Sequence, residues 1–336
     1  MQDVAQAAGV SVSTVSRALR GSSKVRPSTI AAVRAAAYSL GFVASPSASS
    51  LATGKVRRVA VLIGAPLTDW FSGSILDGIY DVLREAGLDL LLYRVHNRSE
   101  RDEFFRILPA RRNADALIVA SFALSEEEER ILDDSETPVV FLSQRVAGHA
   151  SVGVDDAGDG RTAARLLLNL GHTRFAYLRN SLDLGFRWSA RGRHDGWTRE
   201  LDDASVTQEA RVDIDLPVGP DFGEKAAARL LAGPLPVAVT AENDDLALRL
   251  LIALERIGAR VPQDIAIVGF DGQPRALEFG ITTVAQPVHD MARLAAEAAT
   301  ALALGATVDW HALPDDAVEL PTTLLLGRTT QAIART

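Results

Sequence analysis

Cysteine is absent from this chain of 336 residues, and methionine occurs only twice. Without cysteine there can be no disulfide, no thiolate zinc ligand and no cysteine nucleophile. Long hydrophobic runs are missing as well. No stretch reaches the roughly 18 apolar residues of a membrane span, and the first thirty residues lack the apolar region of a signal peptide. Apolar residues still make up 47% of the chain. We therefore expect a folded cytoplasmic protein of two or three domains, with no membrane partner.

Acidic residues are scarce in the N-terminal part of the sequence. Residues 1–58 contain eight basic residues and a single acid, Asp3, which gives a net charge of +7. Residues 59–336 contain 27 basic and 42 acidic residues, which gives a net charge of −15. This asymmetry predicts a small module that binds nucleic acid, joined to an acidic body with a different task.

The first 42 residues predict three short helices, over 3–8, 12–20 and 27–40, each followed by a glycine that can end it. In the second helix, Val15 and Ala18 lie on an apolar face, and the opposite face is mostly polar. Two helices joined by a short turn, the second with polar residues at its N-terminal end, are typical of a helix-turn-helix unit.

The string DVAQAAGVSVSTVSRAL, residues 3–19, resembles the start of the lactose-repressor (LacI/GalR) family of bacterial transcription regulators. The resemblance implies that the second helix reads base edges in the major groove. The implied base contacts come from Val12, Ser13 and Arg17, and Arg17 suits a guanine edge because its planar fork pairs two acceptors. The remaining implied DNA contacts, mostly to phosphates, come from Ser11, Thr14, Ser16 and Arg20.

Residues 45–54, SPSASSLATG, are similar to the hinge helix of that family. A helix this short and rich in serine is not stable alone in water, and the resemblance implies that it orders on DNA. Leu51 would then enter the minor groove and help to kink the site. Packing of Leu51 on the body is the alternative. The implied hinge contacts are Ser45, Ala48, Leu51 and Ala52.

From residue 57 onward, apolar strands alternate with amphipathic helices, which predicts two doubly wound α/β units. We expect strands at 59–64, 89–93, 114–120, 139–142, 175–178, 237–240 and 265–269. The helices between them are expected near 73–86, 98–112, 126–134, 158–170, 189–201, 221–232 and 243–257. No glycine-rich nucleotide motif, no G-x-S-x-G and no metal spacing among the six histidines is present. We therefore expect no cofactor, no metal and no enzymatic activity.

The body resembles the effector domain of the same family, which is similar to periplasmic sugar-binding proteins. Stretches such as SVGVDD at 151–156 and VGFD at 268–271 carry this resemblance. It implies a headpiece over 1–44, a hinge over 45–56, an effector-binding domain over 57–328 and a tail over 329–336. The domain would have an N-subdomain (57–157 and 287–315) and a C-subdomain (158–285 and 316–328), with the effector in the cleft between them.

The resemblance also transfers a set of cleft residues to this sequence. They are Trp70, Phe71, Arg187, Ser189, Arg193, Asn243, Asp271 and Gln286. Trp70 offers an apolar face for a ring, and the polar residues offer donors and acceptors for hydroxyls, which favours a sugar or a nucleoside-like effector. A free acid facing Arg187 and Arg193 is the alternative. For Phe71 a place in the core is the alternative, and Asn243 suits a helix N-cap.

The main prediction is therefore a repressor-type regulator of transcription that binds a pseudo-palindromic operator as a homodimer, with a small molecule as inducer or co-repressor. A homodimer is favoured over a tetramer because no leucine heptad follows Arg328. A sugar-binding transport protein and an enzyme on the same fold are the competing classes. The basic N-terminal module argues against the first, and the lack of a catalytic set argues against the second.

Overall fold

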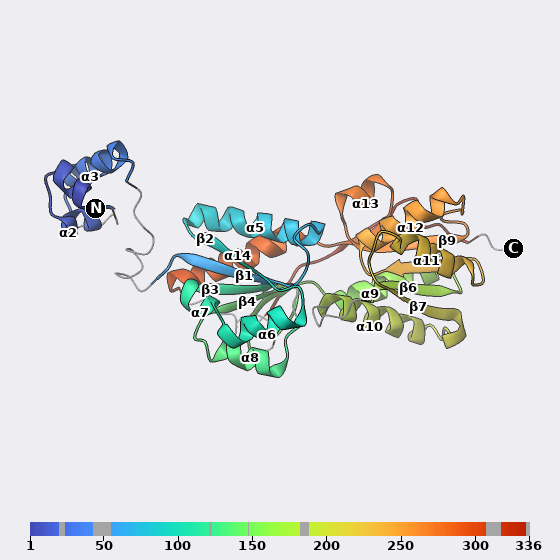
Figure 1. Cartoon of the computed structure of the whole chain (residues 1–336). Coiled ribbons are helices and arrows are strands. Elements are labelled where there is room, and N and C mark those ends of the chain that lie inside the picture. The colour runs from blue at the N-terminus through green and yellow to red at the C-terminus, as the bar shows by residue number, and fades with distance from the viewer. Residues whose placement is uncertain are drawn as a thin grey trace. The chain divides into compact units, whose positions relative to one another are not determined.

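The computed structural model describes residues 1–19, 24–42, 55–120, 123–146, 148–181, 188–306 and 317–333. It separates into two compact units, Met1–Arg57 and Arg58–Thr336. Both are drawn in Figure 1, and each unit has a hydrophobic core of its own. We describe them one at a time.

The first unit is a bundle of three helices: α1 (Gln2–Ala7), α2 (Val12–Leu19) and α3 (Pro27–Ser39). The side chains that the helices bury against one another are small and apolar: Val4, Ala5, Val15, Ala18, Val33, Ala36 and Ala37. The predicted helices are confirmed to within one residue where the structure describes them. The hinge segment 45–54 lies outside the described residues, as does Arg20.

The second unit contains two lobes, each built on one sheet. The first sheet has the order β11-β5-β4-β3-β1-β2, and all of its neighbouring strands are parallel. Its strands are β1 (Arg58–Ile63), β2 (Asp89–Arg94), β3 (Ala116–Ala120), β4 (Val139–Leu142), β5 (Ala150–Gly153) and β11 (Ala317–Glu319). We call this sheet and its helices the first lobe.

The second lobe repeats the arrangement, with the strand order β12-β10-β9-β8-β6-β7. Its strands are β6 (Phe175–Asn180), β7 (Arg211–Leu216), β8 (Val237–Ala241), β9 (Ile265–Asp271), β10 (Thr282–Ala285) and β12 (Thr323–Leu325). All pairs are parallel except β10 with β12. In such doubly wound sheets, ligands bind at the carboxyl ends of the strands.

Helices cover both faces of each sheet, as Figure 1 shows. In the first lobe, α5 (Trp70–Ala86) and α14 (Val288–Leu304) bury one face, and α6 (Arg98–Ile107), α7 (Ala110–Asn113) and α8 (Glu126–Asp133) bury the other. In the second lobe, α11 (Phe222–Leu231) and α12 (Asp244–Arg256) cover one face. The opposite face is covered by α9 (Asp156–Asn169) and α10 (Trp188–Asp203). The short helices η1 (Gln208–Ala210) and α13 (Pro274–Glu278) lie in loops.

Three connections between the lobes lie in the described residues. Residues 154–155 join β5 to α9, residues 286–287 join β10 to α14, and residues 320–322 join β11 to β12. The last connection differs from the prediction, which assigned 316–319 to the C-subdomain. β11 instead pairs with β5 in the first sheet, Ala317 opposite Ser151. The chain therefore crosses only after Glu319.

Several elements depart from the predicted ones for identifiable reasons. The helix expected over 98–112 is broken at Leu108, which has a φ of +43°, because Pro109 disfavours helical backbone at the residue before it. The predicted elements omit α14 and the strands β5, β7, β10, β11 and β12. Of these, β7 is an edge strand in which only Ile214 is buried. Residues 329–333, predicted as a tail, pack on the second lobe, where Thr329 donates a hydrogen bond to the carbonyl of Ile267 (2.7 Å). Among the described helices, none combines the length and apolar character required to span a membrane.

Candidate functional site

The helix-turn-helix unit presents a polar, exposed end of α2. The hydroxyl of Ser11 accepts a hydrogen bond from the backbone N–H of Thr14 (3.2 Å) and so caps the helix. Ser13 and Arg17 are exposed, and Val12 keeps 42% of its surface accessible although it is apolar. The opposite face of α2, with Val15 and Ala18, is buried in the core of the unit.

This arrangement leaves the predicted base-reading side chains free to meet a partner. Arg17 has no hydrogen-bond or ion-pair partner in the described part of the chain. Thr14 and Ser16 are half-buried beside it. Since α2 buries its apolar face and leaves a guanidinium and hydroxyls outside, it has the form of a recognition helix.

A second polar cluster lies inside the Arg58–Thr336 unit and centres on Arg193. This side chain of α10 is 5% exposed. Its Nε donates to Asp156 (2.9 Å), and its Nη1 donates to the backbone carbonyl of Glu242 (3.0 Å) and lies 3.4 Å from the carboxylate of Asp271. The guanidinium also lies over the ring of Phe270, 4.8 Å from its centroid. Arg193 thus joins the start of α9 to the carboxyl ends of β8 and β9.

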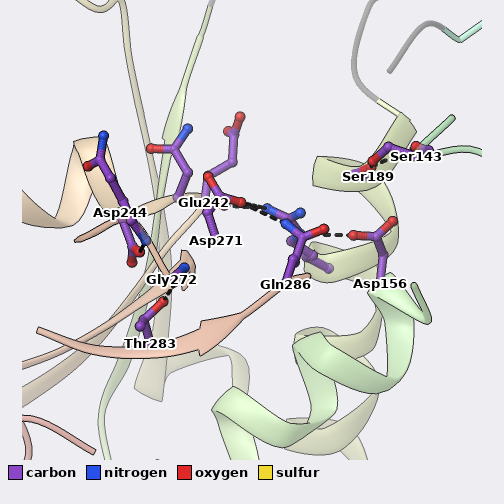
Figure 2. Close-up of polar contacts among 12 residues, drawn as sticks. Ser143, Asp156, Ser189, Glu242, Asp244, Asp271, Gly272, Thr283 and Gln286 are labelled. Carbon is purple, nitrogen blue, oxygen red and sulfur yellow. Dashed lines mark hydrogen bonds and ion pairs between the residues drawn. The ribbon is translucent and has the colours of Figure 1, made fainter. Parts of the chain in front are cut away.

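Asp271 connects this cluster to the connection at residues 286–287. The Oδ1 atom of Asp271 accepts a hydrogen bond from Gln286 Nε2 (2.7 Å), and Figure 2 shows the two side chains facing each other. The backbone of Asp271 has a φ of +103°, which is strained for a residue other than glycine. Gly272 follows with a φ of +73°, and an added Cβ there would lie 2.5 Å from that of Ala285. The fold holds this carboxylate in place against local backbone preference.

Burial controls the charges of the cluster. It raises the pKa of Asp271 from 3.8 to about 8, against the opposing effect of Arg193. Burial also raises the pKa of Asp156. Burial alone would lower the pKa of Arg193, but the two carboxylates hold that pKa above its usual value. The guanidinium is therefore a fixed cation whose two acidic partners are poorly solvated.

Further polar groups near Arg193 complete the site. Ser189 donates to the carbonyl of Ser143 (3.0 Å), a contact between the two lobes that Figure 2 also shows. Asp244 accepts from the backbone N–H of Gln273 (2.8 Å), and burial raises the pKa of this carboxyl to about 7. The buried atoms Asp244 Oδ1 and Gln286 Oε1 find no hydrogen-bond partner in the described part of the chain. Buried polar atoms without a protein partner are unusual, and here they can bond a ligand hydroxyl or a water.

Two cavities of more than 200 Å³ adjoin the cluster. The larger, about 610 Å³, is lined by Glu242, Asn180 and Arg179 of the second lobe and by Ala123 of the first. The smaller, about 260 Å³, is lined by Gln286 and Gly272 together with Trp70. Volumes of this order are typical of sites for small ligands.

The structure brings together some of the predicted cleft residues and separates others. Arg193, Asp271 and Gln286 form one network, and Trp70 reaches the adjoining cavity as the first residue of α5. Phe71 is half-buried and packs against the core of the first lobe. Asn243 caps α12, since its side chain accepts from the N–H of Leu246 (3.0 Å).

Arg187 lies outside the described residues. Sequence reasoning missed Asp156 and Glu242, although Asp156 is the last residue of the SVGVDD stretch that carried the family resemblance. The signal for Asp156 was its position three residues after a short strand, β5, that was itself not predicted.

Comparisons with known proteins agree with the division of the chain into a helix-turn-helix unit and an α/β unit. Residues 1–45 match the family described as bacterial regulatory proteins, lacI family, and residues 164–330 match the periplasmic binding protein-like domain. The transcriptional regulator GalS of Salmonella typhimurium is 32% identical over 311 residues, covering 91% of this chain and 90% of GalS.

Two solved structures are similar over nearly the full length. The regulator CelR in complex with cellobiose is 27% identical, with a TM-score of 0.68 and coverage of 98% of this chain and 99% of CelR. The Lac repressor dimer bound to operator and the anti-inducer ONPF is 24% identical, with a TM-score of 0.82 and coverage of 98% of both chains, and shows the shared fold.

The fold and the site define a transcription regulator with a helix-turn-helix DNA-binding unit and a sensor unit like a periplasmic binding protein. The chain belongs to the lacI family of bacterial regulatory proteins. The predicted family and fold class are confirmed.

Proposed function

We propose that this regulator acts in the cytoplasm as a homodimer that binds a pseudo-palindromic operator. One recognition helix reaches one half-site, so two copies are needed for a two-fold symmetric site. Val12, Ser13 and Arg17 would read bases, while Ser11, Thr14 and Ser16 would contact phosphates. Arg20 and the hinge residues Ser45, Ala48, Leu51 and Ala52 remain proposed DNA contacts outside the described residues. No catalytic activity is proposed, because the relatives found are transcriptional regulators.

We further propose that a small polyhydroxylated molecule, a sugar or a nucleoside-like compound, binds beside Arg193 and controls operator affinity. The observation that carries this proposal is the buried Arg193–Asp271–Gln286 network, which carries an unpartnered acceptor on Gln286 and adjoins the Trp70 cavity. A hydroxyl can donate to Asp271 and accept from Arg193 at the same time. The cellobiose bound to CelR is a ligand of this chemistry.

The network favours a neutral polyol over a free acid. Arg193 already donates to Asp156 and to the carbonyl of Glu242 and lies 3.4 Å from Asp271, so few of its donors are left for an added carboxylate. Of the remaining predicted contacts, Ser189 and Asn243 stay proposed as polar neighbours, with Phe71 as an apolar one. Arg187 is proposed from the resemblance alone.

The proposed organisation has a headpiece and a hinge, over 1–44 and 45–56. Next comes an effector-binding domain to residue 328, divided between the lobes at 154–155, 286–287 and 320–322.

A two-stage experiment tests this function. Binding-site selection with the full chain should enrich a palindromic sequence, and fluorescence anisotropy should then show binding that weakens on the order of 10³-fold between 50 and 200 mM salt if about six phosphates are contacted. Sugars, nucleosides and sugar acids are next screened by thermal shift, since a ligand of the folded state raises Tm.

A hit must also change operator affinity and lose its effect in Asp271→Asn. A selection that yields no palindrome would refute the operator proposal. Operator binding that no hit modulates would refute the effector proposal alone.

A further inference from the structure

A separate hollow lies at the amino ends of the strands of the second sheet, opposite the carboxyl ends where the Arg193 cluster lies. Because β6 and β8 are parallel, their amino ends, at Phe175 and Val237, lie together, away from the carboxyl ends that carry Glu242 and Asp271. The cavity at this edge has a volume of about 240 Å³. We call it the outer hollow. Its lining contains none of the residues of the Arg193 cluster.

The floor of the outer hollow is apolar. Phe175, Ile214, Leu230 and Val237 line it, and each is at most 6% exposed in the folded chain. On the adjacent edge strand, Val212 also lines the hollow and keeps 43% of its surface accessible. An apolar floor does not favour the binding of a small hydrated ion, but it favours the binding of a ligand with an apolar ring or chain.

The rim of the outer hollow is cationic. Arg174 and Arg229 line it, both are exposed, and neither guanidinium has a hydrogen-bond or ion-pair partner in the part of the chain that the structure describes. The third arginine of the lining, Arg211, is engaged by Asp202 (2.7 Å) and by backbone carbonyls. Glu209 is the acid of the lining, so the rim keeps a net positive charge.

Two arginines without an acidic partner in the described residues lie on the rim of the same hollow, on a body that is acidic as a whole. Residues 59–336 carry a net charge of −15, and arginines such as Arg161 and Arg165 of the second lobe are paired with acids. A guanidinium can donate two parallel hydrogen bonds to a carboxylate. In the described part of the chain, no carboxylate accepts such bonds from Arg174 or Arg229.

We propose that the outer hollow is a second ligand site, for a small hydrophobic carboxylate. The ring or chain of the ligand packs on Phe175 and Leu230, and its carboxylate pairs with Arg174 and Arg229. A cavity of this volume holds a small molecule and not a peptide segment. This site is independent of the proposed effector site, because the two lie at opposite ends of the same parallel strands.

The test uses the full chain and 2-naphthoate as the probe, with uncharged 2-naphthalenemethanol as the matched control ligand. Calorimetry should show naphthoate binding that weakens about tenfold or more in the double variant Arg174→Gln/Arg229→Gln, since two charge-assisted contacts are lost. Arg112→Gln, which removes an exposed charge from the first lobe, should bind as the original chain does. Naphthalenemethanol should bind at least about tenfold more weakly than naphthoate.

Three results would overturn the proposal: no binding of naphthoate, equal binding by the double variant, or equal affinity for the uncharged control. Naphthoate binding that survives in the double variant but is lost in Asp271→Asn would place the acid in the effector site and overturn it too. Thermal unfolding of all variants checks that the exposed substitutions leave the fold unchanged.

Discussion

Replacing Arg193 by alanine should lower the stability of the protein as well as weaken the binding of the proposed effector. The substitution removes the guanidinium that pairs with both Asp156 and Asp271 and leaves the two carboxyl groups without it in a poorly solvated site. It also removes the donor to the carbonyl of Glu242 and the cation over Phe270. Removing one partner of a buried ion pair costs about 3–5 kcal/mol, a large share of the 5–15 kcal/mol that stabilises a typical domain.

The cost of Arg193→Ala should depend on pH in a defined direction. The folded-state pKa of Asp271 is raised to about 8, above its unfolded value, so the folded chain binds a proton that the unfolded chain releases. Stability therefore falls as pH rises toward 8. Without the guanidinium, which lowers this pKa, the carboxyl titrates at still higher pH. The variant then continues to lose stability at pH values above 8. The difference in the free energy of unfolding between the original chain and the variant should therefore be larger at pH 9 than at pH 6.

Urea unfolding of the full chain at pH 6 and pH 9, followed by circular dichroism, measures this deficit. The matched control is Arg193→Ala/Asp271→Asn, which removes the titrating carboxyl group and should recover about 1–3 kcal/mol at pH 9. Asparagine tolerates the positive φ of Asp271 better than most residues do, so the control introduces little new strain. A deficit below about 1 kcal/mol that does not change with pH would show that Arg193 is not part of a buried ionic network.

Three further predictions concern the other parts of the molecule. Arg17→Ala should cost about 1–3 kcal/mol of operator binding and relax the preference at one position of each half-site, which repeated site selection would reveal; an unchanged preference contradicts base reading. Gly196→Ala should destabilise by about 1–3 kcal/mol, because its Cβ would lie 1.9 Å from the carbonyl oxygen of Ala157, whereas Gly73→Ala, with no atom within 4 Å, should stabilise by up to about 1 kcal/mol. Equal unfolding midpoints for the two glycine variants would refute this packing. Asn243→Ala should lower stability by about 1 kcal/mol through loss of the α12 cap even when no ligand is present, and a change in ligand affinity at unchanged stability would instead favour a direct effector contact.

The fold was largely predictable because its central strands are unambiguous. β1 and β3 read RVAVLI and ALIVA, and such short apolar runs between amphipathic helices indicate buried parallel strands. The edge strand β7, RVDIDL, carries no such signal, since one buried side chain among exposed ones resembles a loop. Its place in the sheet depends on pairing with β6, which is information that local pattern does not hold.

The candidate site was predictable only in part, and for a different reason. Arg193, Asp271 and Gln286 could be assigned from the family resemblance, but the partner of Arg193 on α9 could not. Asp156 reaches Arg193 because α9 and α10 approach at two glycines, where a Cβ on Gly160 would lie 2.0 Å from the carbonyl oxygen of Arg193 and one on Gly196 would meet α9. Close backbone approach of this kind is a three-dimensional property, and a glycine in the sequence indicates it only in retrospect.

The position of the network explains how a small ligand can influence the whole unit. Asp156 directly follows the connection at 154–155, and Gln286 lies in the connection at 286–287. Asp159, on the next turn of α9, accepts a hydrogen bond from Thr322 of the third connection (2.5 Å). A ligand hydroxyl that bonds Asp271 competes with Gln286 and Arg193 for the same carboxylate. Since those two contacts tie the site to two of the connections between the lobes, we expect ligand binding to bias one arrangement of the lobes through direct contacts, with no long pathway required.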